Sequence, residues 1–294
     1  MKKLTVFTPT YNRAHLLPRL YESLCRQTSQ DFIWMIVDDG STDNTKELAE
    51  NWKAENKIEI QYFYKQNGGM HTAHNLAYQK IETELNTCID SDDFMPDDAV
   101  ENILEIWKSF PDKSTLAGII GLDADMNRKI IGSEIPKNIK TGTLPDLYSK
   151  YKVTGDKKIV LRTDVVKKYP LYPEFKNEKL VPLGTLYLLI AKDYNCIYIN
   201  KILCIVDYQE TGSTKSIFKQ YRQSPKGFAY ARKLHIKTCD SFIGKIKAYT
   251  HLISSAIFSK DISLAFRDIN PVITLCMLPF GILLNIYIRI KIKI

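Results

Sequence analysis

Several common sequence features are missing from this chain. Its six cysteines are scattered, with no C-x-x-C pair and no metal-ligand spacing. They are expected to be reduced and mostly buried, which is typical of a cytoplasmic protein and argues against a disulfide scaffold. No internal repeat or low-complexity segment is recognisable. A signal peptide is not expected, because Met1-Lys2-Lys3 runs directly into a strand-like segment. What remains is an ordinary globular protein, long enough at 294 residues for one large domain with an appendage.

Acidic residues are scarce near the C-terminus. From Thr211 to Ile294 the chain has fourteen Lys/Arg and three Asp/Glu, while the whole chain has a net charge of only +8. The basic character therefore belongs to this region, which predicts an anionic partner, either nucleic acid or the cytoplasmic membrane leaflet. Because no motif that reads DNA or RNA accompanies the charge, the membrane is favoured.

One long uncharged stretch lies inside this basic region. Pro271–Ile288 carries no charge and is followed by Arg289, Lys291 and Lys293. As a helix it would be about 27 Å long, at the lower limit for crossing a membrane. The basic flank favours a helix in the membrane interface or a re-entrant one, and a core-packing helix is the alternative.

The first 210 residues alternate between strand-like and helix-like segments. The unit length is near thirty residues, which predicts an α/β fold whose mostly parallel sheet is flanked by helices on both sides. Strands are expected at 4–8, 32–37, 58–64, 87–89, 116–122 and 158–163, and two short strands at 196–206, separated near Asn200-Lys201. Helices are expected at 14–28, 46–53, 71–81 and 98–109.

Polar residues gather where these strands end. The loops are Pro9–Arg13, Asp38–Thr42, Asn67–Gly69 and Asp90–Asp93. Open α/β sheets bind ligands outside the carboxyl ends of their strands, so the four loops are expected to form one crevice. The three carboxylates in the last loop repel one another unless a cation or suitable donors hold them, and Mg²⁺ prefers oxygen ligands of this kind.

Three of these segments resemble the motifs of family 2 glycosyltransferases in order and spacing. They are Phe7–Arg13 (FTPTYNR), Val37–Asp43 (VDDGSTD) and Asp90–Asp93 (DSDD). The resemblance covers roughly residues 3–210 and implies the GT-A (Rossmann-like) fold. It also implies an inverting transferase that uses a nucleotide sugar, usually a UDP-sugar, with Mg²⁺ or Mn²⁺. We therefore expect a GT-A domain at residues 1–212 and a helical, basic, membrane-associating region at 213–294.

The resemblance also implies roles for individual residues. Tyr11 would offer a flat surface to uracil and Asp39 an acceptor for its N3–H. Asp90 would contact ribose or the metal shell, and Asp92 would bind the metal that bridges to the diphosphate. The full set expected at the donor nucleotide is Thr8, Pro9, Tyr11, Arg13, Asp39, Asp90 and Ser91, with Asp38 and Asp93 as further candidates. Asp38 could instead cap a helix or pair with Arg13.

The segment Asn67–Asn75 departs from the family, which often has Lys or Arg at some of these positions. Met70 and His74 stand where the family pattern predicts a cation that meets the donor. Despite this departure, Asn67, His71, His74 and Asn75 are expected to make further contacts with the donor phosphates or sugar.

Inverting transfer requires a base that deprotonates the acceptor hydroxyl. The family places an acidic residue, often in a Glu-Asp pair, after its D-x-D motif, at about the distance that separates Asp92 from Glu178 in this chain. The matching residue is Glu178, followed here by Lys179 instead of the second acid, and Glu174 is its competitor. Alternatively, Glu178 opens the next helix, where an acid is favourable.

These features predict a metal-dependent, non-processive glycosyltransferase, since no Gln-x-x-Arg-Trp motif is present. It would act on a saccharide or polyprenyl-diphosphate-linked acceptor in cell-surface polysaccharide synthesis. Its expected location is cytoplasmic, peripheral on the inner face of the cell membrane. Nucleic acid is not expected among its partners. The alternatives are a catalytically impaired nucleotide-sugar-binding partner of another transferase and a nucleotidyltransferase.

Overall fold

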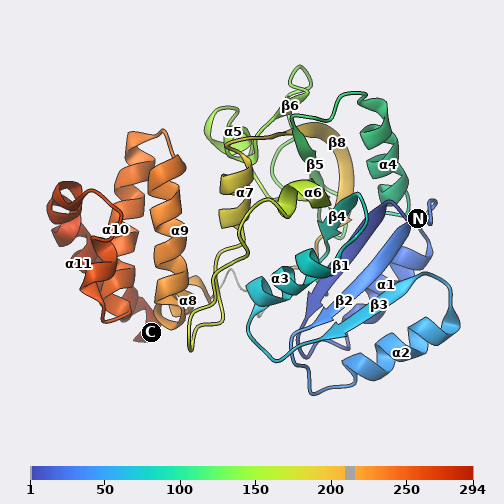
Figure 1. Ribbon diagram of the computed structural model, residues 1–294, viewed down its shortest axis with the longest axis horizontal. Helices are drawn as coiled ribbons and strands as arrows, with labels where there is room; N and C mark the ends of the chain where they lie inside the picture. Colours follow the sequence, from blue (N-terminus) through green and yellow to red (C-terminus); the bar gives the residue numbers. More distant parts are fainter. Residues whose placement is uncertain (1, 209–215, 294) are drawn as a thin grey trace. The chain divides into compact units, whose positions relative to one another are not determined.

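A computed structural model describes residues 2–208 and 216–293, and the chain divides into two compact units (Figure 1). One comprises Met1–Pro170 with Asp193–Gln209, and the other comprises Leu171–Lys192 with Glu210–Ile294. The domain boundary predicted between residues 212 and 213 lies outside the described residues. Residues 171–192, which the sequence analysis assigned to the transferase domain, group with the C-terminal helices.

The first unit contains one eight-stranded sheet in the order β3-β2-β1-β4-β7-β5-β8-β6. The strands β1 to β4 are parallel, whereas β7 runs antiparallel to both of its neighbours, β4 and β5. Strand β8 is parallel to β5, and the short β6 is antiparallel to β8. The bounds are β1 Leu4–Thr10, β2 Phe32–Asp38, β3 Ile60–Tyr64, β4 Leu85–Cys88, β5 Leu116–Ala124, β6 Thr141–Gly142, β7 Lys157–Arg162 and β8 Asn195–Ile205. The predicted α/β fold with a mostly parallel sheet is confirmed.

The last strand differs from its prediction. The apolar residues from 196 to 206 suggested two short strands, but β8 is continuous. Its pairing with β5 shifts register between Ile120↔Tyr198 and Leu122↔Ile202, so the polar Asn200 and Lys201 fall in an irregularity of the ladder. Such irregularities let a strand accommodate extra residues without ending it.

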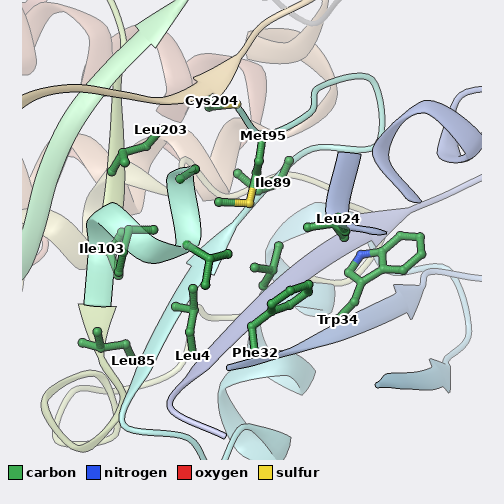
Figure 2. Close-up of a cluster of buried hydrophobic side chains, with 14 of the residues drawn as sticks. Leu4, Leu24, Phe32, Trp34, Leu85, Ile89, Met95, Ile103, Leu203 and Cys204 are labelled. Atoms are coloured by element: carbon green, nitrogen blue, oxygen red, sulfur yellow. The ribbon is translucent and has the colours of Figure 1, made fainter. Parts of the chain in front are cut away.

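Helices cover both faces of the sheet. The largest core cluster lies on the face that packs against α1 (Leu17–Cys25), α2 (Thr45–Glu55) and α4 (Ala99–Ser109). Figure 2 shows part of it, with Phe32 and Trp34 from β2 near Leu4 of β1 and Leu24 of α1. Alternate strand residues point to the opposite face, where Phe7 contacts α3 (Met70–Lys80) through Tyr78. Two short helices, α5 (Leu144–Ser149) and α6 (Thr163–Val166), complete the unit.

The second unit is helical. Its elements are α7 (Gly184–Ile190), α8 (Ile217–Gln223), α9 (Pro225–Thr238), α10 (Phe242–Phe258), the 3-10 helix η2 (Ile262–Ala265) and α11 (Pro271–Lys293). Helix α10 packs against both α9 and α11. Their core is a small cluster of buried apolar residues that includes Ala229, Tyr249, Leu252, Ile253 and Met277.

Candidate functional site

Hydrogen bonds join the predicted loops at the carboxyl ends of the parallel strands. The backbone N–H of Asn12, after β1, donates to Ser41 Oγ at 2.9 Å, and the N–H of Thr42 donates to Asn12 Oδ1 at 2.7 Å. Asn12 has a φ of +53°, a left-handed conformation that asparagine adopts more readily than most residues. The first two motifs are thus in direct contact.

The two aspartates of the second motif have different surroundings. Asp38 accepts the N–H of Ser41 and the hydroxyl of Tyr62, both at 2.7 Å. It therefore organises its own turn and does not pair with Arg13. Gly40 permits this turn, because its φ is +88° and an added Cβ would lie 2.8 Å from the Asn67 nitrogen.

Asp39 connects the second motif to the loop after β3. Its Oδ1 accepts from Lys65 Nζ at 2.7 Å and from the N–H of Gly68 at 2.9 Å, and its Oδ2 accepts from the N–H of Gly69 at 2.7 Å. Asn67 donates to the Asp39 carbonyl. A carboxylate has about four acceptor positions, so Asp39 is held rigidly and keeps room for one further donor at Oδ2.

The third motif is joined to the first by an ion pair. Arg13 Nη1 lies 2.6 Å from Asp92 Oδ2, and the Asp92 side chain is 18% exposed. Arg19, which the sequence analysis did not identify, donates to the backbone carbonyl of Asp92 and pairs with Asp207 at 2.8 Å. Its guanidinium also lies over the Phe94 ring. Two arginines therefore hold the acidic loop: Arg13 binds the Asp92 carboxylate, and Arg19 binds the Asp92 backbone carbonyl.

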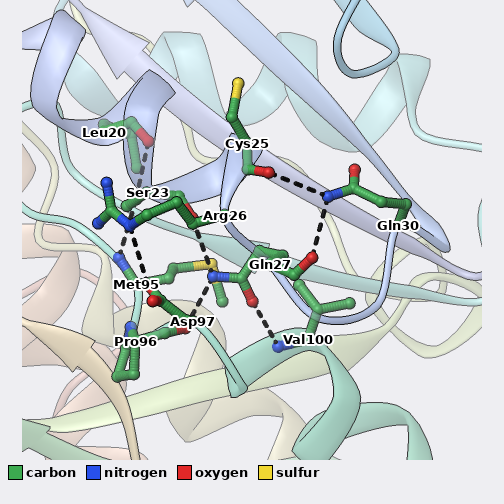
Figure 3. Close-up of polar contacts among 10 residues, drawn as sticks. All are labelled: Leu20, Ser23, Cys25, Arg26, Gln27, Gln30, Met95, Pro96, Asp97 and Val100. Atoms are coloured by element: carbon green, nitrogen blue, oxygen red, sulfur yellow. Dashed lines mark hydrogen bonds and ion pairs between the residues drawn. The ribbon is translucent and has the colours of Figure 1, made fainter.

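A buried amide fixes the chain that follows this loop (Figure 3). Gln27 donates to the Pro96 carbonyl at 2.7 Å and accepts the N–H of Val100 at 3.0 Å. Ser23 Oγ accepts the N–H of Met95 at 3.3 Å. Gln27 and Ser23 are both buried, and they connect the end of α1 to the start of α4. Their signal in the sequence was weak, since polar residues near a helix end are usually exposed.

Lys158, near the start of β7, is a further residue that was not predicted from the sequence. Its Nζ donates to the Cys88 carbonyl at 3.3 Å. Burial alone would lower the pKa of this ammonium, but neighbouring acidic groups, Cys204 and Asp123 first among them, raise it well above its usual value. Burial raises the pKa of Asp93 to about 7, and Lys158 opposes that rise. Asp123 is 4% exposed and its Oδ1 has no hydrogen-bond partner. Burial raises its pKa, and Lys158, followed by Lys157, opposes that rise.

We expect Lys158→Met to destabilise the first unit. Removing one partner of a fully buried charge pair costs about 3–5 kcal/mol, and about 2–3 kcal/mol is expected here because Lys158 is only partly buried. The melting temperature should fall by roughly 5–10 °C. Lys108→Met, an exposed lysine on α4, is the matched control. The double variant Lys158→Met/Asp123→Asn should recover part of the lost melting temperature. If Lys158→Met melted at the same temperature as the control, Lys158 would not offset the buried carboxylates.

Several predicted donor contacts lie in the core instead of on the site surface. Thr8 is fully buried and its Oγ1 accepts the indole N–H of Trp34 at 3.0 Å. His74 is 1% exposed and packs edge-on against Phe7, and burial lowers its pKa to about 3. It is a neutral core histidine on α3, so it does not replace the family's cation. The other predicted residues with buried side chains are Pro9, Asp38, Asp39, His71, Asn75, Ser91 and Asp93. Tyr11, in contrast, is 48% exposed.

Glu178 belongs to the second unit. Its Oε1 and Oε2 accept the backbone N–H groups of Lys226 and Gly227 at 3.0 and 2.9 Å, at the N-terminus of α9. Gly227 allows this approach, because an added Cβ would lie 2.0 Å from the Leu180 carbonyl oxygen. Glu178 does not open the next helix, which begins at Gly184, and Lys179 is exposed.

The acidic loop fits a metal that is shared with a ligand. Within residues 2–208 and 216–293, no three His, Cys, Asp or Glu side chains are grouped so as to hold a metal ion alone. Asp92 offers a partly exposed hard oxygen donor next to Asp90 and Asp93. Mg²⁺ typically combines one or two carboxylates with phosphate and water oxygens, and this donor set suits such a shared site.

The chain matches a known family over more than half of its length. The family model "Glycosyl transferase family 2" matches residues 5–169. The protein therefore belongs to glycosyl transferase family 2.

Two of its relatives by sequence match it over a small part of their own length. An uncharacterized glycosyltransferase of Rickettsia felis is 36% identical over 99 residues, which are 34% of this chain and 16% of that protein. The chondroitin synthase of Pasteurella multocida is 33% identical over 124 residues, 42% of this chain and 12% of that enzyme. The matched segments thus span less than a fifth of the length of either relative.

Solved structures confirm the GT-A fold. S. aureus TarS 1–349 in complex with UDP-GlcNAc aligns with a TM-score of 0.60 and 18% identity, covering 92% of this chain and 77% of that one. The mannosyltransferase PcManGT of Pyrobaculum calidifontis, in complex with GDP-Man and Mn²⁺, aligns with a TM-score of 0.56 and 16% identity, covering 97% and 87%. Identities this low establish the fold alone.

Proposed function

We propose that this protein is an inverting, non-processive glycosyltransferase that moves a sugar from a UDP-sugar to an acceptor hydroxyl. The observation that carries the proposal is the set of contacts between the three motifs, above all the Arg13–Asp92 ion pair. It joins the expected base-binding loop to the expected diphosphate-binding loop. The TarS complex with UDP-GlcNAc supports a UDP-sugar as donor.

Two residues suit the recognition of uracil. Tyr11 has an exposed ring at the end of β1, which offers a surface for stacking. Asp39 is fixed by three donors and retains an acceptor position for the uracil N3–H. A rigid acceptor loses little entropy on binding, so it discriminates between bases effectively.

In the transfer step, the acceptor oxygen attacks the anomeric carbon on the face opposite the nucleotide. The bond from that carbon to the diphosphate oxygen breaks, the nucleoside diphosphate leaves, and the hydroxyl proton passes to a general base, for which Glu178 is the candidate that the sequence predicts. Mg²⁺ or Mn²⁺ held by Asp92 would supply a Lewis acid that neutralises charge on the leaving diphosphate. Arg13, released from Asp92, would remain close enough to pair with the same phosphates.

The acceptor is proposed to be a saccharide or a lipid-linked saccharide used in cell-surface polysaccharide synthesis. The matching segments of chondroitin synthase and of a Staphylococcus epidermidis teichoic acid poly(glycerol phosphate) polymerase support this class. The basic region from residue 213 onward would hold the enzyme at the cytoplasmic membrane surface, where lipid-linked acceptors are found.

Calorimetric titration of the full chain with UDP and GDP tests the donor site. We expect UDP to bind at least about tenfold more tightly with Mn²⁺ than with a chelator. The reason is that the diphosphate oxygens and the Asp92 carboxylate would bind the same metal ion. UDP should also bind more tightly than GDP because Asp39 matches the uracil edge. Tighter binding of GDP would overturn the choice of donor, and the absence of any nucleotide binding would overturn the transferase proposal.

A further inference from the structure

The C-terminal helix α11 exposes an unusually apolar surface. By length and composition its Pro271–Ile292 segment could cross a membrane, with a mean hydropathy of 2.0 and 28% of its most apolar window buried. Six of its large apolar side chains are between 49% and 65% exposed: Val272, Leu275, Phe280, Leu283, Ile286 and Ile290. A core-packing helix would bury such residues, and soluble monomers rarely expose large contiguous apolar patches.

The opposite side of α11 is a narrow seam that binds α10. Thr274, Gly281, Asn285 and Ile288 lie on this side and are all buried. Their spacing of seven, four and three residues places them on one face of the helix. At Gly281 an added Cβ would lie 2.4 Å from Ile253 Cγ2, so glycine allows the two helices to approach closely.

Polar contacts fix the orientation of α11 on α10. Asn285 Nδ2 donates to the Ser254 carbonyl at 3.1 Å, and Arg289 Nε donates to Asn285 Oδ1 at 2.8 Å. The Arg289 guanidinium also lies over the Phe258 ring. Rotation of α11 about its axis would leave Asn285 unpaired in an apolar setting, so the same side always faces away from α10.

We infer that the exposed side of α11 is a membrane-docking face that lies in the plane of an anionic bilayer. The inference rests on the membrane location in the proposed function and names the surface responsible for it. Lipid is the partner because the segment Pro271–Ile288 is uncharged while the region from Thr211 onward has fourteen basic and three acidic residues. This combination matches an apolar lipid interior beneath an anionic headgroup layer.

The packing of the helices favours the in-plane orientation over a crossing one. Helix α11 contacts α10, and α10 contacts α9. If α11 crossed the bilayer upright, these neighbours would be drawn to the same depth together with Lys245 and Lys247 of α10 and Arg232 and Lys233 of α9. Charged side chains at that depth are strongly unfavourable. When α11 lies flat, only its exposed side enters the lipid.

Co-sedimentation of the full chain with phosphatidylcholine vesicles, with and without phosphatidylglycerol, tests the docking face. Leu283 on α11 is 63% exposed and Leu171, outside α11, is 44% exposed, which makes a matched pair for Leu→Glu substitution. We expect Leu283→Glu to lower the partition coefficient on phosphatidylglycerol vesicles by about tenfold or more. Leu171→Glu should bind like wild type. Val272→Glu repeats the test at the other end of the helix if Leu283→Glu folds poorly.

The orientation is tested with single labels at Arg267→Cys and Lys291→Cys, exposed charged positions at the two ends of the apolar segment. The background is Cys276→Ser, because Cys276 is the exposed one of the six cysteines. In preformed vesicles, both labels should be quenched by a membrane-impermeant reagent added outside. Protection of one label would mean that the helix crosses, and would overturn the in-plane orientation.

Two results would overturn the docking face itself. One is equal vesicle binding by Leu283→Glu and wild type. The other is a wild-type dimer that Leu283→Glu dissociates, which would identify a second copy as the partner. UDP binding by Leu283→Glu should remain unchanged. Vesicle binding without UDP binding would refute the proposed transferase and support the docking face. UDP binding without vesicle binding would refute the docking face and support the proposed donor site.

Discussion

Asp92→Asn should reduce the kcat of sugar transfer about a thousandfold. A bound metal stabilises charge on the leaving group by several kcal/mol, and about 4 kcal/mol corresponds to this factor. The amide keeps the shape of the side chain but loses the negative charge that attracts both a divalent cation and Arg13. Initial rates with a UDP-sugar and Mn²⁺ measure the effect, and calorimetry should show that UDP binding no longer depends on Mn²⁺.

Asp97→Asn is the matched control for this substitution. Asp97 follows the same loop and pairs with Arg26 at 3.2 Å, but its side chain is 51% exposed. Loss of an exposed ion pair costs about 0–1 kcal/mol of stability, so its kcat should remain near that of wild type. Retention of full Mn²⁺-dependent activity by Asp92→Asn would exclude Asp92 as the metal ligand.

Glu178→Gln should lower kcat about 10²- to 10⁴-fold if Glu178 is the base that accepts the acceptor proton. The KM for the donor should change little, since the base acts on the acceptor. The structure makes this test informative because the same carboxylate caps α9. A residue that only caps the helix would instead lower stability by about 1 kcal/mol and leave kcat within a few-fold.

Glu174→Gln separates the two carboxylates of this segment. Glu174 is exposed, so its amide variant should melt like wild type. If Glu178→Gln loses stability but not activity while Glu174→Gln loses activity, the role of base passes to Glu174. A pH–rate profile of wild type provides a second readout, because a general base gives an acidic limb that its amide variant lacks.

The local order of residues was sufficient to predict much of this protein. The apolar runs that end in Pro9, Asp38 and Asp90 predicted parallel strands with polar loops at one edge, and β1, β2 and β4 confirm that arrangement. Apolar periodicity and motif spacing are properties of neighbouring residues, and short-range sequence therefore carries them. The same holds for the basic character of the C-terminal region.

Side-chain surroundings required the tertiary structure. His74 was expected near the donor, yet its position on α3 directs it against Phe7 in the core. Lys158 was not expected in the site at all, because its role depends on an antiparallel strand inserted between β4 and β5. Such insertions bring together residues that are distant in the chain, and no local pattern records them.

The sequence by itself determined the family, the alternating architecture and the loops that carry Tyr11, Asp39 and Asp92. Only the tertiary structure decided which atoms those residues contact. Arg13 meets Asp92 across 79 positions of the chain, and Glu178 meets Gly227 across 49. The physical reason is that hydrogen bonds and ion pairs depend on distances of a few ångströms, which are set by how strands and helices pack and not by the order of residues along the chain.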